Sequence, residues 1–413
     1  MTNFEAITKN KKSKIMSFSF LYKMTKSVLP MIGICLCIGW CYAWSLFSVP
    51  IASHMEVSKI AVQLTFCLNI LLLGLGAAFF GNLVERKIKL SALLSTGLLA
   101  TGFLLTAYGL HVKSMWPIYL GSGVCCGLSQ GIGYVISPKN LLLWWNKTKY
   151  KATIMSMSII CFGLGSSVCS LLFNWLYPNY GIENTFLVLC GIYSIVMLAS
   201  TAVINKPKFA LAKLKKAVKF DYIQMFKNTM FWKLWLFMFL NISAGLVLIG
   251  NCAPILNSTG LSAAMITTVM FICGLSNGLG RLVFPVIADF MKNKAKICLL
   301  ILGIELCLVS PTIFICTAIP LMIILCNATY GAAFACLPSL VSYNYGNSYL
   351  TTIHGLILSA WGIASVFAYF CSTMLQYYNI GYIGMLISIF AMYAINFVNV
   401  LTFKKNSLQT LKN

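Results

Sequence analysis

Long apolar segments recur from Val28 to near the end of the sequence, with short polar turns between them. A segment of about 20 apolar residues can cross the hydrocarbon core of a bilayer as an α-helix. Inside lipid every backbone N–H and C=O group must find its partner within the protein, so membranes are spanned by helices or by closed barrels. Barrel strands alternate apolar and polar residues, and these segments do not. The sequence therefore predicts an all-α, polytopic membrane protein.

Twelve such segments can be placed, in two sets of six. The turn after the second segment carries Glu85 beside basic residues, and the turn after the eighth carries Asp289 before lysines, 204 residues later. An offset close to half of the 413 residues indicates two pseudo-symmetric six-helix halves. The segments are expected at residues 28–50, 61–84, 90–110, 116–145, 152–177, 184–204, 231–256, 262–290, 297–317, 319–343, 350–374 and 380–403.

Polar, lysine-rich stretches frame the two sets of segments. We expect the first stretch to be a disordered tail, extended by an interfacial turn around residues 18–22. The central one is expected to be a connector that either lies on an anionic leaflet or is a solvated linker. The predicted organisation is a basic tail at 1–27, an N-terminal half at 28–204, a basic linker at 205–230, a C-terminal half at 231–403 and a second tail at 404–413.

The distribution of lysine and arginine predicts the orientation of the chain. Twenty-six of these 30 residues lie in the two tails, the central linker and the even-numbered turns, while the opposite turns hold Lys59 and Lys113. Cytoplasmic loops are the ones enriched in positive charge. We therefore expect both termini on the cytoplasmic side of the plasma membrane or of an organelle membrane. The net charge of +23 then reflects membrane topology and does not indicate a nucleic-acid partner.

The remaining composition gives no sign of catalysis or of a bound cofactor. The 17 cysteines lie mostly within apolar segments, where cysteine behaves as a small apolar residue. Three histidines and seven acidic residues are scattered over the chain, so we expect neither an enzyme nor a metal site. Asn257 begins a glycosylation sequon in a predicted external turn, close to the membrane.

Arg281 lies deep within the eighth apolar segment. It stands about two helical turns before Asp289, or roughly 12 Å along the helix axis. A cation inside the bilayer costs about 2.5–3.5 kcal/mol on insertion scales, so it normally faces the interior of a bundle and meets an anion. Gly278 and Gly280 beside it allow neighbouring helices to approach closely. We expect Arg281 to bind an anion on a transport path; the alternative is a structural arginine bonded to backbone carbonyls or to a neighbouring residue.

Several stretches resemble the oxalate/formate antiporter branch of the major facilitator superfamily, which is related to the monocarboxylate transporters. The resemblance covers both halves, and it implies the twelve-helix major facilitator fold and a carrier of small carboxylates that works by alternating access. The matching stretches are Gly39–Pro50 in the first segment, Gly131–Tyr134 and Trp144–Lys147 in the fourth, Asn277–Arg281 and Asp289 in the eighth, Tyr330–Pro338 in the tenth, and His354–Gly362 in the eleventh.

The resemblance also implies which residues bind the substrate. Arg281 matches the family's arginine on the eighth helix, and aromatic residues of four helices are expected to line its pocket: Tyr42, Tyr134, Tyr330 and Trp361. The chain departs from the family twice. Trp361 stands where the oxalate carrier has a lysine, which argues against a dianionic substrate. Asn277 stands where monocarboxylate transporters have an aspartate, which argues against that route of proton coupling.

Three further residues are candidates for proton coupling or gating. Glu305 is the one carboxylate in the middle of an apolar segment, although the ninth helix is usually peripheral in this fold. His354 shares a helical face with Trp361, and a structural hydrogen bond would explain it equally well. Lys139 lies near the cytoplasmic end of its segment, where a lysine can extend toward the headgroups.

Taken together, the sequence favours a carrier for a monocarboxylate such as pyruvate, lactate or formate over one for oxalate. Transport would be anion exchange or proton-coupled, with the bilayer and protons as further partners and a monomer as a sufficient unit. Two other functions stay open. One is a sensor or scaffold that keeps a transporter fold without transport, and the other is an efflux carrier for another small organic solute.

Overall fold

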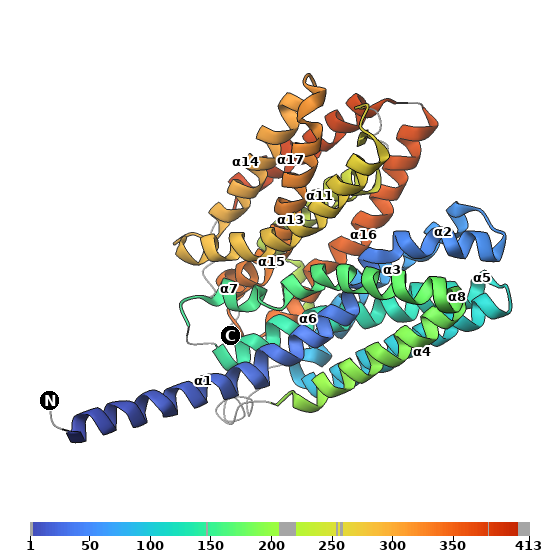
Figure 1. The fold of residues 1–413 in the computed structure, drawn as a ribbon. Coiled ribbons are helices and arrows are strands. Elements are labelled where there is room, and N and C mark those ends of the chain that lie inside the picture. Colours follow the sequence, from blue (N-terminus) through green and yellow to red (C-terminus); the bar gives the residue numbers. More distant parts are fainter. Residues whose placement is uncertain are drawn as a thin grey trace.

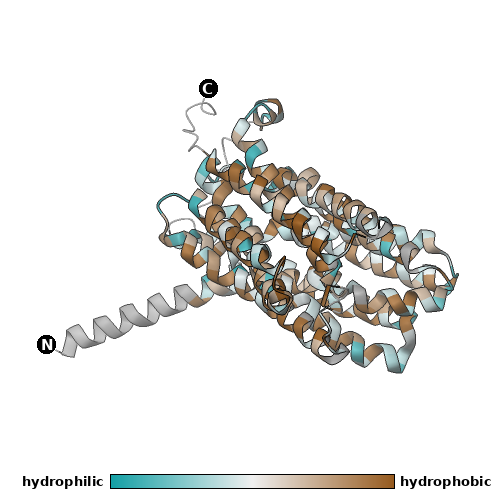
Figure 2. Ribbon diagram, turned by 90° about the horizontal axis from the view of Figure 1, so that it is seen from above, coloured by the Kyte–Doolittle hydropathy of each residue, from teal (hydrophilic) through white to brown (hydrophobic). Residues whose placement is uncertain are grey.

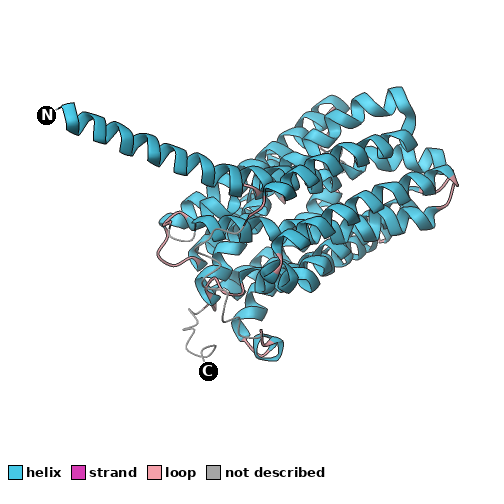
Figure 3. Ribbon diagram, turned by 90° about the horizontal axis from the view of Figure 1, so that it is seen from below, coloured by secondary structure: helices cyan, strands magenta, loops and turns pink. Residues whose placement is uncertain are grey.

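The computed structural model describes residues 3–145, 148–205, 220–252, 255–256, 259–378 and 380–403. In this part of the chain every regular element is a helix, as Figure 3 shows. The central stretch 206–219, the tail 404–413 and Asn257 lie outside the described residues, so the boundaries expected there and the use of the sequon stay predictions.

The N-terminal half contains the first six membrane spans. Its elements are α1 (Asn3–Ile38), η1 (Gly39–Ala43), α2 (Trp44–Met55), α3 (Lys59–Arg86), α4 (Ile88–His111), α5 (Met115–Ile118), η2 (Tyr119–Cys125), α6 (Cys126–Trp145), α7 (Lys151–Ser156) and α8 (Ile159–Val203). Elements α1, η1 and α2 together form the first span, and α5, η2 and α6 together form the fourth.

The C-terminal half contains the other six spans. Its elements are α10 (Tyr222–Phe226), α11 (Thr229–Gly250), α13 (Ala263–Phe290), α14 (Ala295–Thr312), η3 (Cys316–Ala318), α15 (Ile319–Tyr345), α16 (Leu350–Tyr377) and α17 (Tyr382–Leu401). Figure 1 shows this half, yellow to red, above the blue-to-green N-terminal half, with α7 where the two meet.

Ten helical stretches among the described residues are long and apolar enough to cross a membrane. One of them covers the 53 residues from Lys151 to Val203. At 1.5 Å per residue it would be about 80 Å long, far more than a bilayer needs, so it contains two spans. The fourth span, which is more polar, completes the twelve helices of the predicted fold. Figure 2 shows hydrophobic residues along the helices and hydrophilic ones mainly near their ends.

Gly181 separates the two spans within α8. Its φ of 74° and ψ of 175° are not helical, and a side chain at this φ would be strained. Phe173 before the break and Phe186 after it both contact the ring of Phe47, at centroid distances of 4.5 and 5.2 Å. In a straight helix these two residues would lie about 20 Å apart. The chain therefore reverses direction at Gly181.

The expectation of a disordered tail at residues 1–27 is wrong for most of that stretch. Helix α1 begins at Asn3 and continues without interruption into the first span. Starting a helix is the unfavourable step, and adding residues to an existing one costs little. Lysine, which is a good helix former, is the most frequent residue in this stretch, so the helix of the span extends into it.

Helix α3 of the first half packs closely on α16 of the second. A Cβ added at Gly74 would lie 2.5 Å from the backbone nitrogen of Gly362, and one added at Gly355 would lie 2.0 Å from the carbonyl oxygen of Ala77. Such distances exclude any side chain at these two glycines. Small residues thus bring the two backbones into contact and hold the two halves together along α3 and α16.

Candidate functional site

Arg281 is completely buried at the centre of the helical bundle, on α13. Its Nε donates a hydrogen bond to Oδ1 of Asn277, 2.9 Å away and one turn earlier. The amide of Asn277 is itself fixed, because its Nδ2 donates to the carbonyl oxygen of Asn327 at 3.1 Å. The two terminal nitrogens of the guanidinium, Nη1 and Nη2, make no hydrogen bond to the described residues. Asn277 therefore holds the arginine in place without neutralising its charge.

Two phenylalanines flank the guanidinium. Its central carbon lies 5.8 Å from the ring centroid of Phe162 on α8 and 5.6 Å from that of Phe334 on α15. Aromatic faces attract a cation at this range, although less strongly than an anion would. These contacts surround part of the guanidinium with apolar rings, and its terminal nitrogens keep no hydrogen-bond partner among the described residues.

Three tyrosines lie near Arg281. Tyr42 comes from η1, Tyr134 from α6 and Tyr330 from α15, and each is close enough for its hydroxyl to interact electrostatically with the guanidinium. None of the three hydroxyls has a hydrogen-bond partner among the described residues. A Cβ at Gly245 would lie 2.3 Å from the Tyr330 ring, so this glycine provides the space for the tyrosine. The three hydroxyls are thus available as donors beside the arginine.

Helix α16 completes the group with Trp361 and His354. The Trp361 ring lies 4.3 Å from that of Phe334 and 5.6 Å from that of Tyr134, measured between centroids. His354 lies 6.1 Å from Tyr134. Both residues are fully buried, and neither the indole nitrogen nor the two imidazole nitrogens have a partner among the described residues.

The structure thus brings together seven of the nine residues that the sequence singled out. They come from both halves of the chain and surround one point in the bundle, and we refer to them as the Arg281 group: Tyr42, Tyr134, Asn277, Arg281, Tyr330, His354 and Trp361. Glu305 and Lys139 lie elsewhere. Among the described residues no set of three or more histidine, cysteine, aspartate or glutamate side chains could hold a metal ion.

The family model of the Major Facilitator Superfamily matches residues 31–369, which is most of the chain. The chain belongs to this superfamily. The crystal structure of the Escherichia coli fucose:proton symporter FucP has the same fold, with a TM-score of 0.74 over 91% of this chain and 98% of FucP, at 10% sequence identity. The expected major facilitator fold is therefore confirmed.

Two curated members of the superfamily are similar in sequence. One is an uncharacterized transporter of this type, YhjX of Escherichia coli, which is 30% identical over 80% of this chain and 82% of YhjX. The other is the oxalate:formate antiporter of Oxalobacter formigenes, which is 25% identical over 82% of both chains. These relatives confirm the resemblance to the oxalate/formate branch that the motifs indicated.

Hydrogen bonds join the two halves at the end of the bundle that carries the basic turns. Glu85, in the last turn of α3, accepts a hydrogen bond from Lys139 Nζ through Oε1. Its Oε2 accepts from the backbone nitrogen of Thr351, 3.1 Å away, and from the Thr351 hydroxyl. Thr351 is the second residue of α16, where backbone N–H groups lack partners within the helix and attract negative charge.

This arrangement corrects the interpretation of Lys139. The sequence suggested a side chain that extends toward the headgroups, but Lys139 is buried and pairs with Glu85. A lysine on α6 can reach the carboxylate on α3 because the two helices pack side by side, which the sequence alone does not reveal. Lys139 therefore belongs to this contact and adds no second charge to the Arg281 group.

Asp289, near the end of α13 in the C-terminal half, makes a matching contact with the N-terminal half. Its Oδ1 accepts from the backbone nitrogen of Ala152 at 2.9 Å, and its Oδ2 accepts from the backbone nitrogen and hydroxyl of Thr153, at 2.8 and 2.7 Å. Ala152 and Thr153 are the second and third residues of α7. Each half thus supplies one carboxylate to the start of a helix in the other. We call these two contacts the carboxylate clamps.

We expect the double substitution Glu85→Gln and Asp289→Asn to loosen this end of the bundle. A hydrogen bond to a charged group contributes about 1.5–3 kcal/mol, so losing both charges should shift the equilibrium toward states in which the halves separate here. Lys89 and Lys292 are exposed on opposite halves and can carry spin labels as unnatural amino acids, which leaves the 17 cysteines unlabelled. Pulsed electron spin resonance should then show a larger fraction of long distances between the two labels.

The matched control for the clamps is Glu183→Gln. Glu183 lies at the opposite end of the bundle, where it pairs with His111 at 3.2 Å, so its substitution should leave the label distances unchanged. An unchanged distance distribution in the double variant as well would show that the clamps do not hold the halves together.

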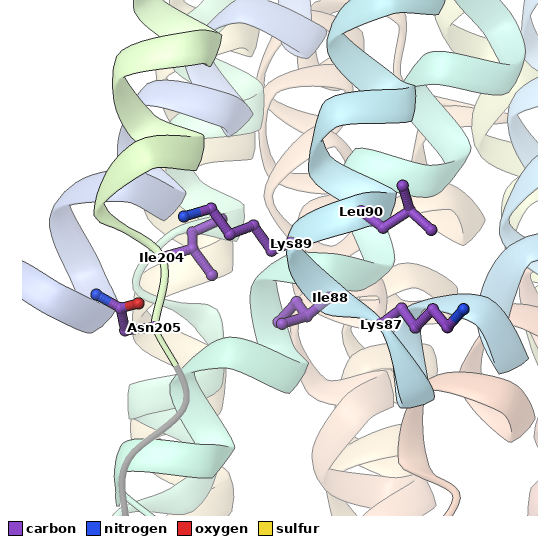
Figure 4. Close-up of a pocket in the computed structure, with 6 residues that line it drawn as sticks. All are labelled: Lys87, Ile88, Lys89, Leu90, Ile204 and Asn205. Carbon is purple, nitrogen blue, oxygen red and sulfur yellow. The ribbon is translucent and has the colours of Figure 1, made fainter.

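A surface hollow of about 330 Å³ lies at the same end of the bundle as the clamps. It is lined by residues 87–90 at the start of α4 and by Ile204 and Asn205 after α8. Figure 4 shows Lys89 extending toward Ile204, whereas Lys87 points away from it. Both lysines are exposed, and the hollow includes no member of the Arg281 group. The buried group, and not this hollow, therefore has the features of a substrate site.

Proposed function

We propose that this member of the Major Facilitator Superfamily carries small carboxylates across the membrane and binds them at Arg281. The observation that supports the proposal is the buried guanidinium whose two terminal nitrogens have no partner among the described residues. Leaving a buried charge unpaired costs several kcal/mol. Such a group is retained where a ligand supplies the missing charge during the working cycle.

The geometry of the free nitrogens favours a carboxylate as that ligand. The planar fork of an arginine donates two parallel hydrogen bonds to a carboxylate, which makes this pairing both strong and directional. The unpartnered hydroxyls of Tyr42, Tyr134 and Tyr330 can donate to the remaining lone pairs of the same group. Arg281 would therefore supply charge, and the tyrosines would orient the substrate.

The rest of the site favours one carboxylate on a small molecule. Phe162, Phe334 and Trp361 form apolar walls near Arg281, and the described residues offer no second cation there. One arginine balances one carboxylate, whereas a dianion would leave an uncompensated charge in a low-dielectric site. A monocarboxylate such as pyruvate, lactate or formate fits this charge balance better than oxalate.

Alternating access gives the carboxylate clamps a role in the same cycle. We infer from the distribution of basic residues that their end of the bundle, and both chain termini, are cytoplasmic. The bonded clamps then correspond to a state closed toward the cytoplasm. Release of the substrate to that side would require both clamps to separate while the helices of each half move together. The cycle can run as anion exchange or as proton-coupled transport.

The test of the proposed function is uptake into proteoliposomes. Purified protein is reconstituted into vesicles loaded with unlabelled pyruvate, and uptake of labelled pyruvate, lactate, formate and oxalate is compared with uptake into protein-free vesicles. We expect uptake of the monocarboxylates. Tight binding without uptake would support a sensor, and uptake of organic cations in preference to all four acids would contradict the proposal.

A further inference from the structure

Glu305 lies in the C-terminal half, outside the Arg281 group. It is completely buried on α14, and both of its carboxyl oxygens lie 3.1 Å from Nδ2 of Asn241 on α11. The Thr329 hydroxyl on α15 lies beside it. Among the described residues no ion pair includes Glu305. It is therefore a buried acid in a polar but uncharged environment.

These surroundings suit the protonated acid better than the carboxylate. An ionised group in a dry interior needs charged partners or several donors, and here one amide nitrogen is shared between two oxygens. The carbonyl oxygen of Asn241 is also buried and has no hydrogen-bond partner among the described residues. A protonated Glu305 could donate its O–H to this oxygen after rotation of the amide, while the amide N–H bonds the other carboxyl oxygen.

The ionised form of Glu305 gains in stability only if a positive charge elsewhere in the membrane needs compensation. Arg281 is such a charge. Among the described lysine, arginine, aspartate and glutamate residues, these two are the ones that lie in the middle of a span. With an empty site, ionised Glu305 and Arg281 together carry no net charge. With a carboxylate on Arg281, neutrality requires Glu305 to be protonated.

Two tyrosines, whose hydroxyls have no hydrogen-bond partner among the described residues, lie near the two positions. Tyr393 on α17 lies within electrostatic range of both Glu305 and Tyr330, and its hydroxyl has no partner among the described residues. Tyr330 in turn lies near Arg281. The titratable groups that face Glu305 are thus Cys326 on α15 and Tyr393 on α17, while α11 presents the amide of Asn241.

We propose that Glu305 is the proton-binding site of an electroneutral symport cycle, in which one proton on Glu305 accompanies each monocarboxylate bound to Arg281. The inference rests on the proposed function of Arg281. An O–H bond forms on Glu305 as the substrate enters, so the loaded membrane core is neutral. The proton leaves with the substrate, and the empty carrier returns with ionised Glu305 balancing Arg281. In this cycle the chain performs net uptake and does not require a counter-anion.

The experiment measures proton uptake that accompanies substrate binding, and it uses the full-length protein in detergent. Pyruvate is titrated calorimetrically in buffers of the same pH but different ionisation enthalpy. We expect the wild type to take up about one proton per bound pyruvate, because binding shifts the protonation of Glu305. Glu305→Gln, which resembles the protonated acid in shape and charge, should bind pyruvate and take up no proton.

Transport by the same proteins provides the second readout. In proteoliposomes an inward proton gradient should drive accumulation of pyruvate by the wild type and by the control variant Glu183→Gln, a partly exposed acid at one end of the bundle. For Glu305→Gln we expect accumulation to fall at least ten-fold, while pyruvate–pyruvate exchange stays within about two-fold of the wild type, because exchange needs no return of the empty carrier.

The outcomes separate this inference from the proposed function. Proton uptake on binding, or gradient-driven accumulation, that persists in Glu305→Gln would overturn the proton site and leave the carboxylate site intact. Wild-type pyruvate exchange without any proton uptake would overturn it as well, even if the variant failed to fold. No binding of any carboxylate by the wild type would reject the proposed function and this inference together.

Discussion

Replacing Arg281 by glutamine is expected to abolish carboxylate transport while the protein still folds. The variant removes one partner of a buried ion pair with the substrate, a change that typically costs about 3–5 kcal/mol. This corresponds to a loss of more than about a hundred-fold in affinity. Binding of labelled pyruvate and uptake into proteoliposomes measure the effect, and size-exclusion chromatography reports folding. In the unliganded protein the substitution removes an unpaired charge, so it should not reduce stability.

Two matched variants separate charge from geometry. Arg281→Lys keeps the positive charge but loses the planar fork, and we expect it to be inactive too. Asn277→Asp leaves Arg281 in place but gives it a carboxylate within 2.9 Å, which would compete with the substrate at neutral pH. Normal uptake by Arg281→Gln would reject the proposed role of the arginine, and normal uptake by Asn277→Asp would show that its unpaired charge is not what binds the substrate.

The membrane spans could be predicted because the signals that specify them are local. Apolar length marks each helix, and lysines mark the turns. The one error at this level, the tail before Val28, arose because polar composition was interpreted as disorder, although a helix that is already formed can extend into such residues. The sequence predicts a turn between the spans at 152–177 and 184–204. The chain reverses direction within that turn, at Gly181, which has a non-helical conformation.

The Arg281 group was predictable only in part from the residues themselves. A lone arginine in an apolar helix indicates a buried cation, but Tyr42, Tyr134 and Tyr330 have no local signal that separates them from ordinary packing aromatics. The resemblance to a known branch selected them. Phe162 and Phe334 were missed for the same reason, since a phenylalanine in an apolar segment looks like any other core residue until its distance from Arg281 is known.

The clamps show what a single sequence could not reveal. The repeat of an acidic turn, at Glu85 and at Asp289, is visible in the sequence and indicates two similar halves. Each carboxylate bonds the opposite half. The bonded residues are far apart in the sequence, by 266 positions for Glu85 and by 137 positions for Asp289. Such pairings depend on how the halves dock. They could be found from the sequence only if the docking were already known.

Oxalate is expected to bind less tightly than pyruvate, and Trp361→Lys is expected to reverse this preference. In the wild type a dianion at Arg281 keeps one negative charge that no described side chain of the group compensates. Trp361 lies within the group, 5.6 Å from the ring of Tyr134, so a lysine at this position would place a second cation near the bound anion. Two opposite charges 4 Å apart attract by about 4 kcal/mol at an effective dielectric constant of 20.

Competition against labelled pyruvate in proteoliposomes measures the preference directly. For Trp361→Lys we expect the ratio of oxalate to pyruvate affinity to rise at least ten-fold, which needs a difference of only about 1.4 kcal/mol. Trp361→Gln is the matched control, because it removes the ring and adds a polar group of similar length without charge. It should lower the affinity for oxalate and for pyruvate by a similar factor.

The same charge count predicts how many protons accompany substrate binding in the Trp361→Lys variant. In the lysine variant the empty group carries two positive charges, and ionised Glu305 can balance one of them. With oxalate bound to both cations, neutrality again requires Glu305 to be protonated, whereas with pyruvate the remaining cation is balanced by ionised Glu305. The variant should therefore take up about one proton on binding oxalate and none on binding pyruvate. If oxalate already outcompetes pyruvate in the wild type, then some group other than Arg281 neutralises the second carboxylate, and the site does not select its substrate by net charge.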